Sequence, residues 1–369
     1  MRPVSNLLLI LTAVIGLNLS TQASAQSREL HFANWSESIA EDTISDFEAA
    51  TGIKVHYFEF DDIEELEEVW LKEGRRFDII VPGSDNIPKY IAAGQLQKLD
   101  RNRIDNWSQN DPKFMERLSL FDPGNDYAIP YLWGTVGIGY NVQAVEKAFG
   151  GILPEDSWDL LFDPENLGKL DHCNATLMRS PEEIFDVALK YLEKDPNSMS
   201  IAHQYMVANL LSKVRLHITD FDSGEYVEDL ASGKRCIAHA WSGDVLVAQQ
   251  MAEEAGKDFD IRYVMPKEGF PLWIDVVSMP TNAQNIDAAY QFLNYLMQPS
   301  VIANISNETQ YANANMAAQD LVDPELLGNP AVYPRPQELE RTWIPAATKS
   351  RVLALRHKLW QRIIEREEI

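Results

Sequence analysis

The chain has 369 residues, of which 56 are acidic and 32 basic, so its formal net charge at pH 7 is −24. A surface this acidic repels phosphate backbones and attracts small cations, which argues against a nucleic-acid partner. The length is more natural for two lobes than for one hydrophobic core.

Residues 1–25 have the pattern of a secretory signal peptide. Arg2 supplies a positive start, residues 7–19 form an apolar stretch too short to span a membrane, and an Ala-Ser-Ala cleavage signal ends at Ala25. We therefore expect export across the inner membrane and a mature chain that begins at Gln26.

The first hundred residues alternate between strand and helix patterns. Strands are predicted at 29–35, 53–60 and 77–81, with helices at 39–51 and 61–73 between them. This order is typical of a parallel sheet with helices on its faces.

Residues 126–141 are rich in glycine, threonine and β-branched side chains, which suit extended chain. We interpret this segment as a connection that passes between two lobes, and an ordinary hairpin is the alternative. Further patterns predict helix starts near 156 and 181, a strand at 261–265, a helix at 286–297, a polar turn at 311–315 and a terminal helix at 348–367.

Cys173 and Cys236 are the only cysteines of the chain. In an exported protein such a pair suggests a disulfide, which would stabilise the fold by roughly 4 kcal/mol in the chain-entropy model. Two buried thiols are the alternative. Two lone cysteines among scattered histidines lack the ligand spacing of a metal site, so we predict neither a metal nor a cofactor.

Residues 236–244 form an apolar run that ends in Trp-Ser-Gly-Asp, which we interpret as a buried strand and the turn that leaves it. In an open α/β sheet, ligands bind at this edge. An indole face beside a carboxylate suits an organic cation. The alternative is a core tryptophan followed by an aspartate that caps the next helix. A tryptophan followed closely by a carboxylate, after an apolar run, occurs three times in the chain: Trp35 with Glu37, Trp241 with Asp244 and Trp273 with Asp275.

No common catalytic motif is present: the sequence lacks a phosphate-binding loop, a nucleophile elbow, a zinc-protease helix and a dinucleotide-binding glycine pattern. Residues 220–224 lack the later ligands of a calcium loop. We therefore predict that the protein is not an enzyme, and a secreted hydrolase that uses two of the acids is the alternative.

Several motifs, in order from the first strand to about Met316, resemble those of the periplasmic polyamine-binding proteins, the putrescine and spermidine receptors of ABC importers. The clearest are Asn34-Trp-Ser36, Pro130-Tyr-Leu-Trp-Gly-Thr-Val-Gly-Ile-Gly-Tyr-Asn141, Ala240-Trp-Ser-Gly-Asp244 and Tyr311-Ala-Asn-Ala-Asn315. This resemblance implies a two-lobed α/β fold, the type II periplasmic binding protein, in which each lobe is a mixed, mostly parallel sheet flanked by helices. Lobe 1 would comprise residues 26–135 and 262–308, and lobe 2 residues 136–261 and 309–369.

The resemblance also implies a disulfide between Cys173 and Cys236 and a ligand cleft between the lobes. Asp244 and Asp275 are expected to hold one ammonium group, and Glu183 or Glu37 the other. The full set of expected ligand-binding residues is Trp35, Ser36, Glu37, Glu183, Trp241, Asp244, Trp273, Asp275 and Tyr311.

The sequence departs from the family pattern at two positions. Ser38 stands where the family usually has tyrosine, and Gly83 where putrescine-type members carry serine, while Trp273 and Glu37 favour the spermidine type. The implied function is capture of putrescine or spermidine in the periplasm, by a monomer that delivers it to a membrane-embedded ABC permease. A receptor for another solute, such as agmatine, cadaverine or an amino acid, and a polyamine sensor are the alternatives.

Overall fold

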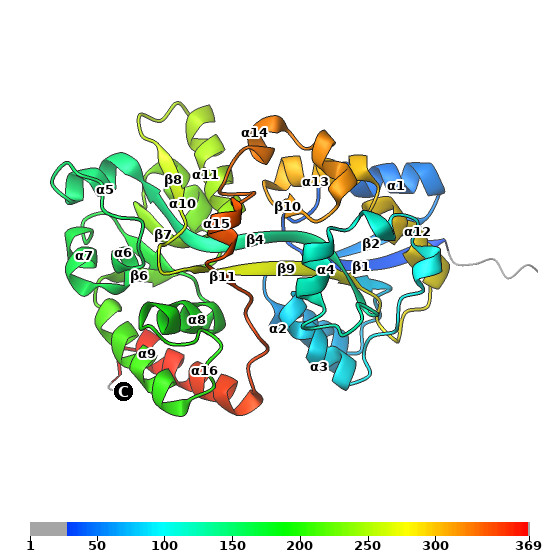
Figure 1. The fold of residues 1–369 in the computed structure, drawn as a ribbon, viewed down its shortest axis with the longest axis horizontal. Coiled ribbons are helices and arrows are strands. Elements are labelled where there is room, and N and C mark those ends of the chain that lie inside the picture. The colour runs from blue at the N-terminus through cyan, green and yellow to red at the C-terminus, as the bar shows by residue number, and fades with distance from the viewer. Residues whose placement is uncertain (1–27, 368–369) are drawn as a thin grey trace, which may run out of the picture.

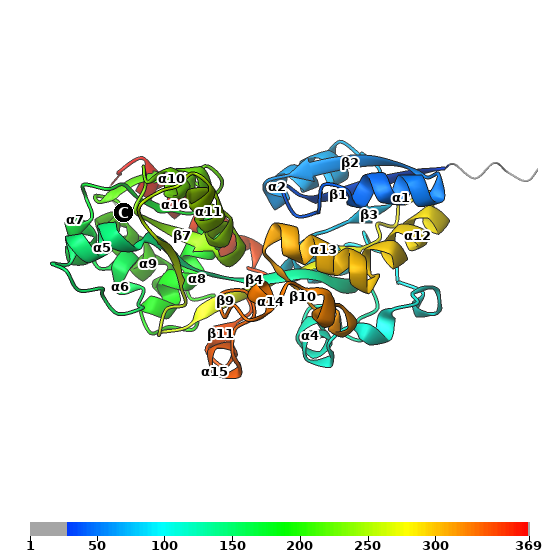
Figure 2. The same ribbon diagram turned by 90° about the horizontal axis from the view of Figure 1, so that it is seen from above.

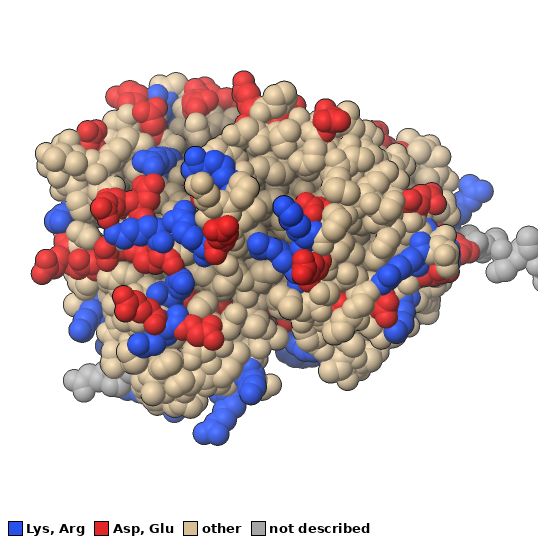
Figure 3. Space-filling model, viewed as in Figure 1, with Lys and Arg blue, Asp and Glu red and all other residues tan. Residues whose placement is uncertain are grey.

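The computed structural model describes residues 28–367, so the expected signal peptide lies outside the described residues. Two α/β lobes lie side by side, and two long strands, β4 (Ala128–Asn141) and β9 (Phe270–Ser278), run from one lobe into the other (Figure 1; Figure 2). In the space-filling view a narrow notch separates the lobes along the lower edge (Figure 3).

The first lobe is built on a sheet in which β1 (Glu29–Trp35) pairs in parallel with β2 (Lys54–Phe60) and β3 (Ile79–Ile80). β3 then pairs antiparallel with β9. The helices on this side are α1 (Thr43–Thr51), α2 (Ile63–Glu67), α3 (Ile87–Ala92), α4 (Pro112–Leu118), α12 (Ile286–Leu296) and α13 (Pro299–Thr309).

In the second lobe, β7 (Ile237–Trp241) lies between β4, to which it is antiparallel, and β5 (Ala175–Leu177), to which it is parallel. β6 (Ile218–Phe221) and β8 (Ile261–Val264) complete the sheet by pairing with β5 and β4. The helices are α5 (Val142–Ala148), α6 (Asp159–Phe162), α7 (Pro164–Lys169), α8 (Pro181–Tyr191), α9 (Ile201–Val214), α10 (Tyr226–Ser232), α11 (Ser242–Glu254) and α16 (Ser350–Ile364).

Strand β4 explains why the segment around it is so apolar and rich in glycine. All 14 of its residues are buried, because its first half pairs with β9 and its second half with β7 and β8. The prediction of an extended connection between lobes is confirmed, and the hairpin alternative is wrong. Hydrogen bonding links the strands in the order β2-β1-β3-β9-β4-β7-β5-β6.

The buried apolar side chains divide into one large cluster in each lobe and a smaller cluster around α10 and α11. The cluster of the first lobe also contains buried side chains of residues 312–332, which include β10 (Ala312–Asn313) and α14 (Pro324–Leu327). The cluster of the second lobe contains Leu359, Trp360 and Ile363 of α16. The chain after residue 309 thus contributes to both cores, with α15 (Pro336–Leu339) and β11 (Thr342–Trp343) between the two parts.

A disulfide joins Cys173 and Cys236, whose Cα atoms are 5.3 Å apart. Cys173 lies two residues before β5 and Cys236 directly before β7, and these two strands are parallel neighbours, so the two side chains start beside each other. The implied pairing is confirmed, and the alternative of two free thiols is wrong.

Three predicted elements differ in detail. β3 has only two residues, and the acidic helix predicted at 61–73 consists of α2 followed by a π-helical stretch at Glu68–Lys72. The expected turn at 311–315 contains the short strand β10, because β4 offers a free edge to it. Within residues 28–367, no helix combines the length and the apolar character that crossing a membrane requires.

Candidate functional site

The residues expected to bind ligand lie where strands end at the junction of the lobes. Trp35 ends β1, Trp241 ends β7, and Tyr311 directly precedes β10. Trp273 and Asp275 lie in β9, which connects the lobes. Both lobes therefore contribute side chains to one region.

Asp244 lies in the first turn of α11, which begins at Ser242 immediately after β7. The expected turn is therefore absent, and the capping alternative is also wrong, because Trp241 occupies the N-cap position. Instead, two phenols bind the Asp244 carboxylate: the Tyr226 hydroxyl donates to Oδ2 at 2.6 Å, and the Tyr311 hydroxyl donates to Oδ1.

These hydrogen bonds connect Asp244 to both lobes, because Tyr226 belongs to α10 and Tyr311 precedes β10. Burial raises the pKa of Asp244, the two tyrosine hydroxyls lower it in part, and the negative charge of Glu37 raises it further. Glu37 is exposed and has a left-handed backbone with φ of 57°. Asp244 and Glu37 thus form one carboxylate group of the site.

Asp275 and Asp85 form a second carboxylate group. Gly83 and Asp275 are paired as an isolated β-bridge, which brings the loop after β3 against β9. Burial, and then the nearby charge of Asp85, hold the pKa of Asp275 well above its usual range, and the Trp35 indole offsets this only in part. Burial also raises the pKa of Asp85 to about 6.

Glu183 lies beside this second group, in the first turn of α8. The Trp241 Nε1–H donates to Glu183 Oε1 at 3.1 Å, whereas the buried Oε2 atom has no hydrogen-bond partner. Burial raises the pKa of Glu183 to about 8, the Trp241 hydrogen bond lowers it in part, and Glu182 and Asp85 raise it further.

Tyr311 lies between the two groups. Burial raises the pKa of its hydroxyl, and the charges of both Asp244 and Asp275 add to that effect. The charge of Glu37 raises the pKa of Asp244, and the charge of Asp85 raises the pKa of Asp275. Neither aspartate is among the groups that shift the pKa of the other. We therefore treat Asp244 with Glu37 and Asp275 with Asp85 as two carboxylate groups, and the Tyr311 hydroxyl, which donates to Asp244, is affected by both.

Two glycines let the aromatic walls approach the backbone. A Cβ atom on Gly134 would lie 2.6 Å from the Trp273 ring, and one on Gly243 would lie 2.6 Å from the Tyr311 ring. The rings of Trp273 and Tyr311 meet edge to face with centroids 4.9 Å apart. Any larger residue than glycine at either position displaces a wall of the site.

Ser36 and Ser38 complete the loop after β1. The backbone N–H of Ser36 donates to the carbonyl of Phe60 at 3.1 Å, and the Ser38 carbonyl accepts from the buried Tyr131 hydroxyl at 2.7 Å. These bonds fix the loop that carries Glu37 and place Trp35 against Phe60, with ring centroids 4.6 Å apart.

Two site residues escaped the sequence analysis. Asp85 follows the predicted strand at 77–81 by four residues, so its position after a buried strand was a usable signal. Tyr226 had no such signal, because it is 18 residues from Asp244 in the sequence and reaches it only through the packing of α10 against α11.

Within the described part of the chain, Asp85, Glu183, Asp244 and Asp275 form no ion pair with a basic side chain. Lys89, whose charge acts on Asp85, makes its ion pair with Glu67 instead. By contrast, the buried Asp186 of α8 is matched by Arg356 at 2.8 Å. The site therefore gathers acidic groups that no basic side chain of the described residues neutralises.

Trp241→Phe tests the link between the indole and Glu183. Loss of the Nε1–H donor should raise the Glu183 pKa further and weaken binding of a cationic ligand by about 1 kcal/mol, roughly fivefold. Calorimetric titration with putrescine at pH 7 and again at pH 9 checks this, because the deficit should shrink at pH 9, above the Glu183 pKa of about 8, where a larger share of Glu183 is ionised in both proteins. An equal deficit at both pH values would show that the indole acts by contact alone.

Comparisons with known proteins cover almost the whole chain. A family model described as bacterial extracellular solute-binding protein matches residues 42–333. Over 357 residues, 96% of this chain and 96% of the relative, the sequence is 40% identical to the putrescine-binding periplasmic protein PotF of Escherichia coli (strain K12). It is 36% identical over 364 residues, 98% of this chain and 99% of the relative, to the putrescine/agmatine-binding protein of Pseudomonas aeruginosa.

The fold also matches solved structures. The spermidine/putrescine ABC transporter substrate-binding protein PotD of Streptococcus pneumoniae superimposes with a TM-score of 0.75 at 26% identity, covering 92% of this chain and 99% of that chain. The similarity therefore spans both lobes.

Proposed function

Since the chain belongs to the family of bacterial extracellular solute-binding proteins, we propose that it captures a linear polyamine, putrescine or spermidine, between its two lobes. The observation that carries this proposal is the set of unneutralised acids at the lobe junction, Asp85, Glu183, Asp244 and Asp275.

A buried carboxylate without a cationic partner is costly, and the protein responds by raising its pKa. A polyamine brings the missing positive charges on a narrow apolar chain. Its ammonium groups suit the two carboxylate groups, and its methylenes suit the indole and phenol faces between them. A sugar or a neutral amino acid supplies no such charge at both ends.

In the arrangement we propose, Asp244 with Glu37 binds one ammonium group. Asp275 with Asp85 binds the other, and the free Oε2 atom of Glu183 accepts a further hydrogen bond at that end. Asp244 and Asp275 thus serve opposite ends of the ligand rather than the same amine. The walls along the methylenes are Trp35, Trp241, Trp273 and Tyr311, and Ser36 positions the loop of Glu37.

Binding would draw the lobes together about β4, β9 and the segment around β11, because the ligand contacts side chains of both lobes only in the closed arrangement. For the lobes themselves we keep the division 26–135 with 262–308 and 136–261, and propose two changes. Residues 262–264 belong with the second lobe, because β8 pairs there with the second half of β4. Residues 312–332 belong with the first lobe, because their buried side chains pack there.

We propose that the protein works in the periplasm as a monomer, after removal of residues 1–25, and passes its ligand to a membrane-embedded ABC permease. The relatives are periplasmic binding proteins and not enzymes, which leaves no support for the hydrolase alternative.

Agmatine is the second candidate ligand, because its guanidinium group can donate hydrogen bonds in a planar fork to carboxylates such as those of Asp85 and Glu183, and one relative is named for it.

Calorimetric titration with putrescine, cadaverine, agmatine and spermidine tests the proposal, with a sugar and a neutral amino acid as controls. We expect saturable binding of at least one diamine or triamine and a rise in melting temperature. Amines that leave both heat and melting temperature unchanged would overturn it. A polyamine sensor would bind equally well, so growth on the bound amine with and without the permease separates a sensor from a transport receptor.

The acids at the site also predict how binding depends on pH. In the unliganded protein Glu183 has a pKa of about 8 and Asp85 of about 6, so both hold protons below those values. An ammonium group binds the ionised form, so putrescine affinity should rise up to about tenfold per unit as pH increases from 6 to 8, with release of protons. Titrations in buffers of different ionisation enthalpy count those protons.

Stability of the unliganded protein should move in the opposite direction. Because the folded-state pKa of Glu183 is raised, this group binds protons more tightly in the folded state, and its contribution to stability is lost as pH rises from about 4.5 to 8. Glu183→Gln should flatten both pH profiles. Profiles that keep their slope in that variant would assign the effect to other groups.

A further inference from the structure

A second cluster of carboxylates lies where the two lobes face each other, outside the proposed polyamine site. Glu64 belongs to α2 of the first lobe, and Glu182 and His357 belong to α8 and α16 of the second. One ligand atom from each, a carboxylate oxygen or an imidazole nitrogen, lies within 4.8 Å of the others. In Figure 1, α2 faces α8 and α16 along the edge where the notch opens.

The half of this cluster in the second lobe is already assembled. His357 Nε2 lies 2.9 Å from Glu182 Oε1, and the adjacent Arg356–Asp186 ion pair fixes α16 against α8. Glu64 alone comes from the opposite lobe, on a helix whose N-cap Asp62 accepts from the Glu65 N–H at 2.8 Å. Closure of the lobes therefore brings a third group to a preformed pair.

Closure also brings two negative charges together. The Glu64 and Glu182 carboxylates lie close together across the lobe boundary, which produces electrostatic repulsion between them. A cation between them removes it. One imidazole nitrogen with two carboxylate oxygens is a donor set that zinc accepts, and water would fill the remaining positions.

We propose that Glu64, Glu182 and His357 form a divalent-metal site of the zinc class that bridges the two lobes and stabilises the ligand-bound, closed arrangement. Bonds of about 2.0–2.2 Å to zinc would draw the three donor atoms closer together than they are now. Glu64 and His357 are exposed, so their side chains can make that small movement. The sequence showed no metal motif because the donors come from three helices far apart in the chain.

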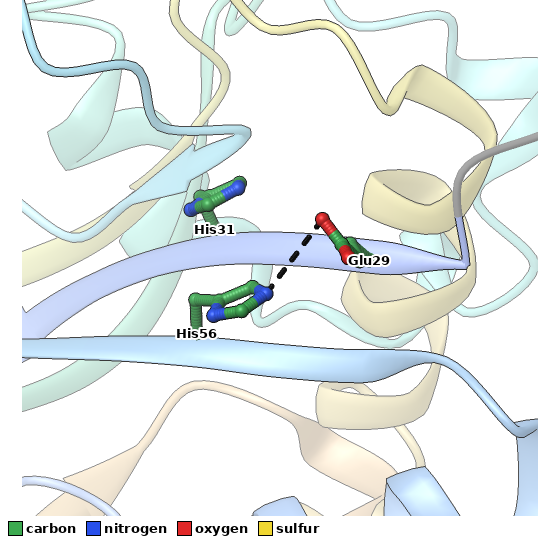
Figure 4. Close-up of side chains that lie close together, drawn as sticks. All are labelled: Glu29, His31 and His56. Atoms are coloured by element: carbon green, nitrogen blue, oxygen red, sulfur yellow. Dashed lines mark ion pairs between the residues drawn. The ribbon is translucent and has the colours of Figure 1, made fainter.

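The structure contains a matched control within one lobe. Glu29, His31 and His56 also place donor atoms within 4.8 Å of one another. Figure 4 shows them on β1 and β2, where His31 and His56 are register partners whose rings stack at 4.7 Å and His56 Nε2 lies 3.7 Å from Glu29 Oε2. Zinc bound at that cluster would contact the first lobe only, so it would not stabilise the closed arrangement of the two lobes.

The inference rests on the proposed function, because it links metal binding to polyamine binding. Thermodynamic linkage then requires zinc to tighten putrescine binding and putrescine to tighten zinc binding by the same factor. The experiment uses tag-free protein, first stripped with a chelator, that carries His31→Asn and His56→Asn. Putrescine is titrated with and without zinc chloride.

We expect zinc to tighten putrescine binding by about fivefold or more. Glu64→Gln should abolish this gain without weakening metal-free putrescine binding, because it removes a repulsive charge from the closed form. His357→Gln should abolish the gain as well. A gain that persists in Glu64→Gln, or no gain in the parent protein, would overturn the bridge. A loss of spermidine affinity in Glu64→Gln without zinc would instead assign the cluster to a ligand amine and also overturn the bridge.

A second measurement separates failure of this inference from failure of the proposed function. Small-angle X-ray scattering of the amine-free protein should show contraction when zinc alone is added, and no contraction in Glu64→Gln. If zinc contracts the protein but no amine binds, the polyamine proposal is rejected and the metal bridge is kept. If an amine binds but zinc neither contracts the protein nor changes amine affinity, the metal bridge is rejected and the polyamine proposal is kept.

Discussion

Replacement of Asp275 by asparagine should weaken putrescine binding by about 2–5 kcal/mol, roughly thirtyfold to several thousandfold. Asparagine has nearly the same shape, so the change removes the charge and leaves the packing of β9 in place. The bound ammonium then loses the charge of Asp275 and keeps Asp85 and Glu183 as its acidic partners at that end. Calorimetric titration at pH 9, above the Glu183 pKa of about 8, measures the loss.

The same substitution should raise the melting temperature of the unliganded protein. Asp275 is buried beside Asp85 without a cation, so its ionised form is disfavoured there and removal of the charge relieves the repulsion. Asp186→Asn is the matched control. It removes an equally buried carboxylate but leaves Arg356 unpaired, so stability should fall while putrescine affinity stays the same. An Asp275→Asn protein that binds putrescine like the wild type would exclude Asp275 from the site.

Replacement of Asp244 by asparagine should have a comparable effect, again about 2–5 kcal/mol of binding free energy. The carboxylate accepts from Tyr226 and Tyr311, so it enters the complex already oriented and needs no rearrangement to meet an ammonium group. Asparagine accepts from only one of these phenols through its oxygen, and it carries no charge. The measurement is the putrescine dissociation constant, together with the circular dichroism spectrum to verify the fold.

Tyr226→Phe separates orientation from charge in this group. The variant keeps the Asp244 carboxylate and the Tyr311 hydrogen bond but loses one donor, so we expect a loss of about 1 kcal/mol, several times smaller than for Asp244→Asn. Equal losses in the two variants would mean that Tyr226 itself touches the ligand or that the loop has moved. A less than threefold loss of putrescine affinity in Asp244→Asn would exclude Asp244 from the proposed site.

The sequence alone supported the two-lobed α/β fold, which the structure and its similarity to solved structures confirm. The strand at 53–60 and the helix at 286–297 could be predicted because their apolar residues recur with a strand or helix period, and the strand at 29–35 because it is a short apolar run. The extended segment at 126–141 could be predicted because its many glycine and β-branched residues disfavour a helix and suit a strand. The disulfide followed from the resemblance, and the parallel pairing of β5 and β7 accounts for it physically.

Local errors arose where long-range contacts decide the structure. α11 begins directly at Ser242 without an intervening turn, and its second residue, Gly243, leaves room for the Tyr311 ring from a distant part of the chain. The strand β10 exists because β4 offers it an edge. Residues 312–332 pack in the first core although the following helix α16 packs in the second, a crossing that no local pattern encodes.

Sequence by itself determined the chemistry available at the site, since apolar runs followed by tryptophan and a carboxylate place both at the edge of a sheet. Only the tertiary structure decided how those groups are combined. It separated Asp244 from Asp275, added Asp85 and Tyr226, and brought Glu64 opposite Glu182 and His357. The physical reason is that charge, burial and hydrogen bonding act through space over a few ångströms, whereas sequence patterns describe only neighbours along the chain.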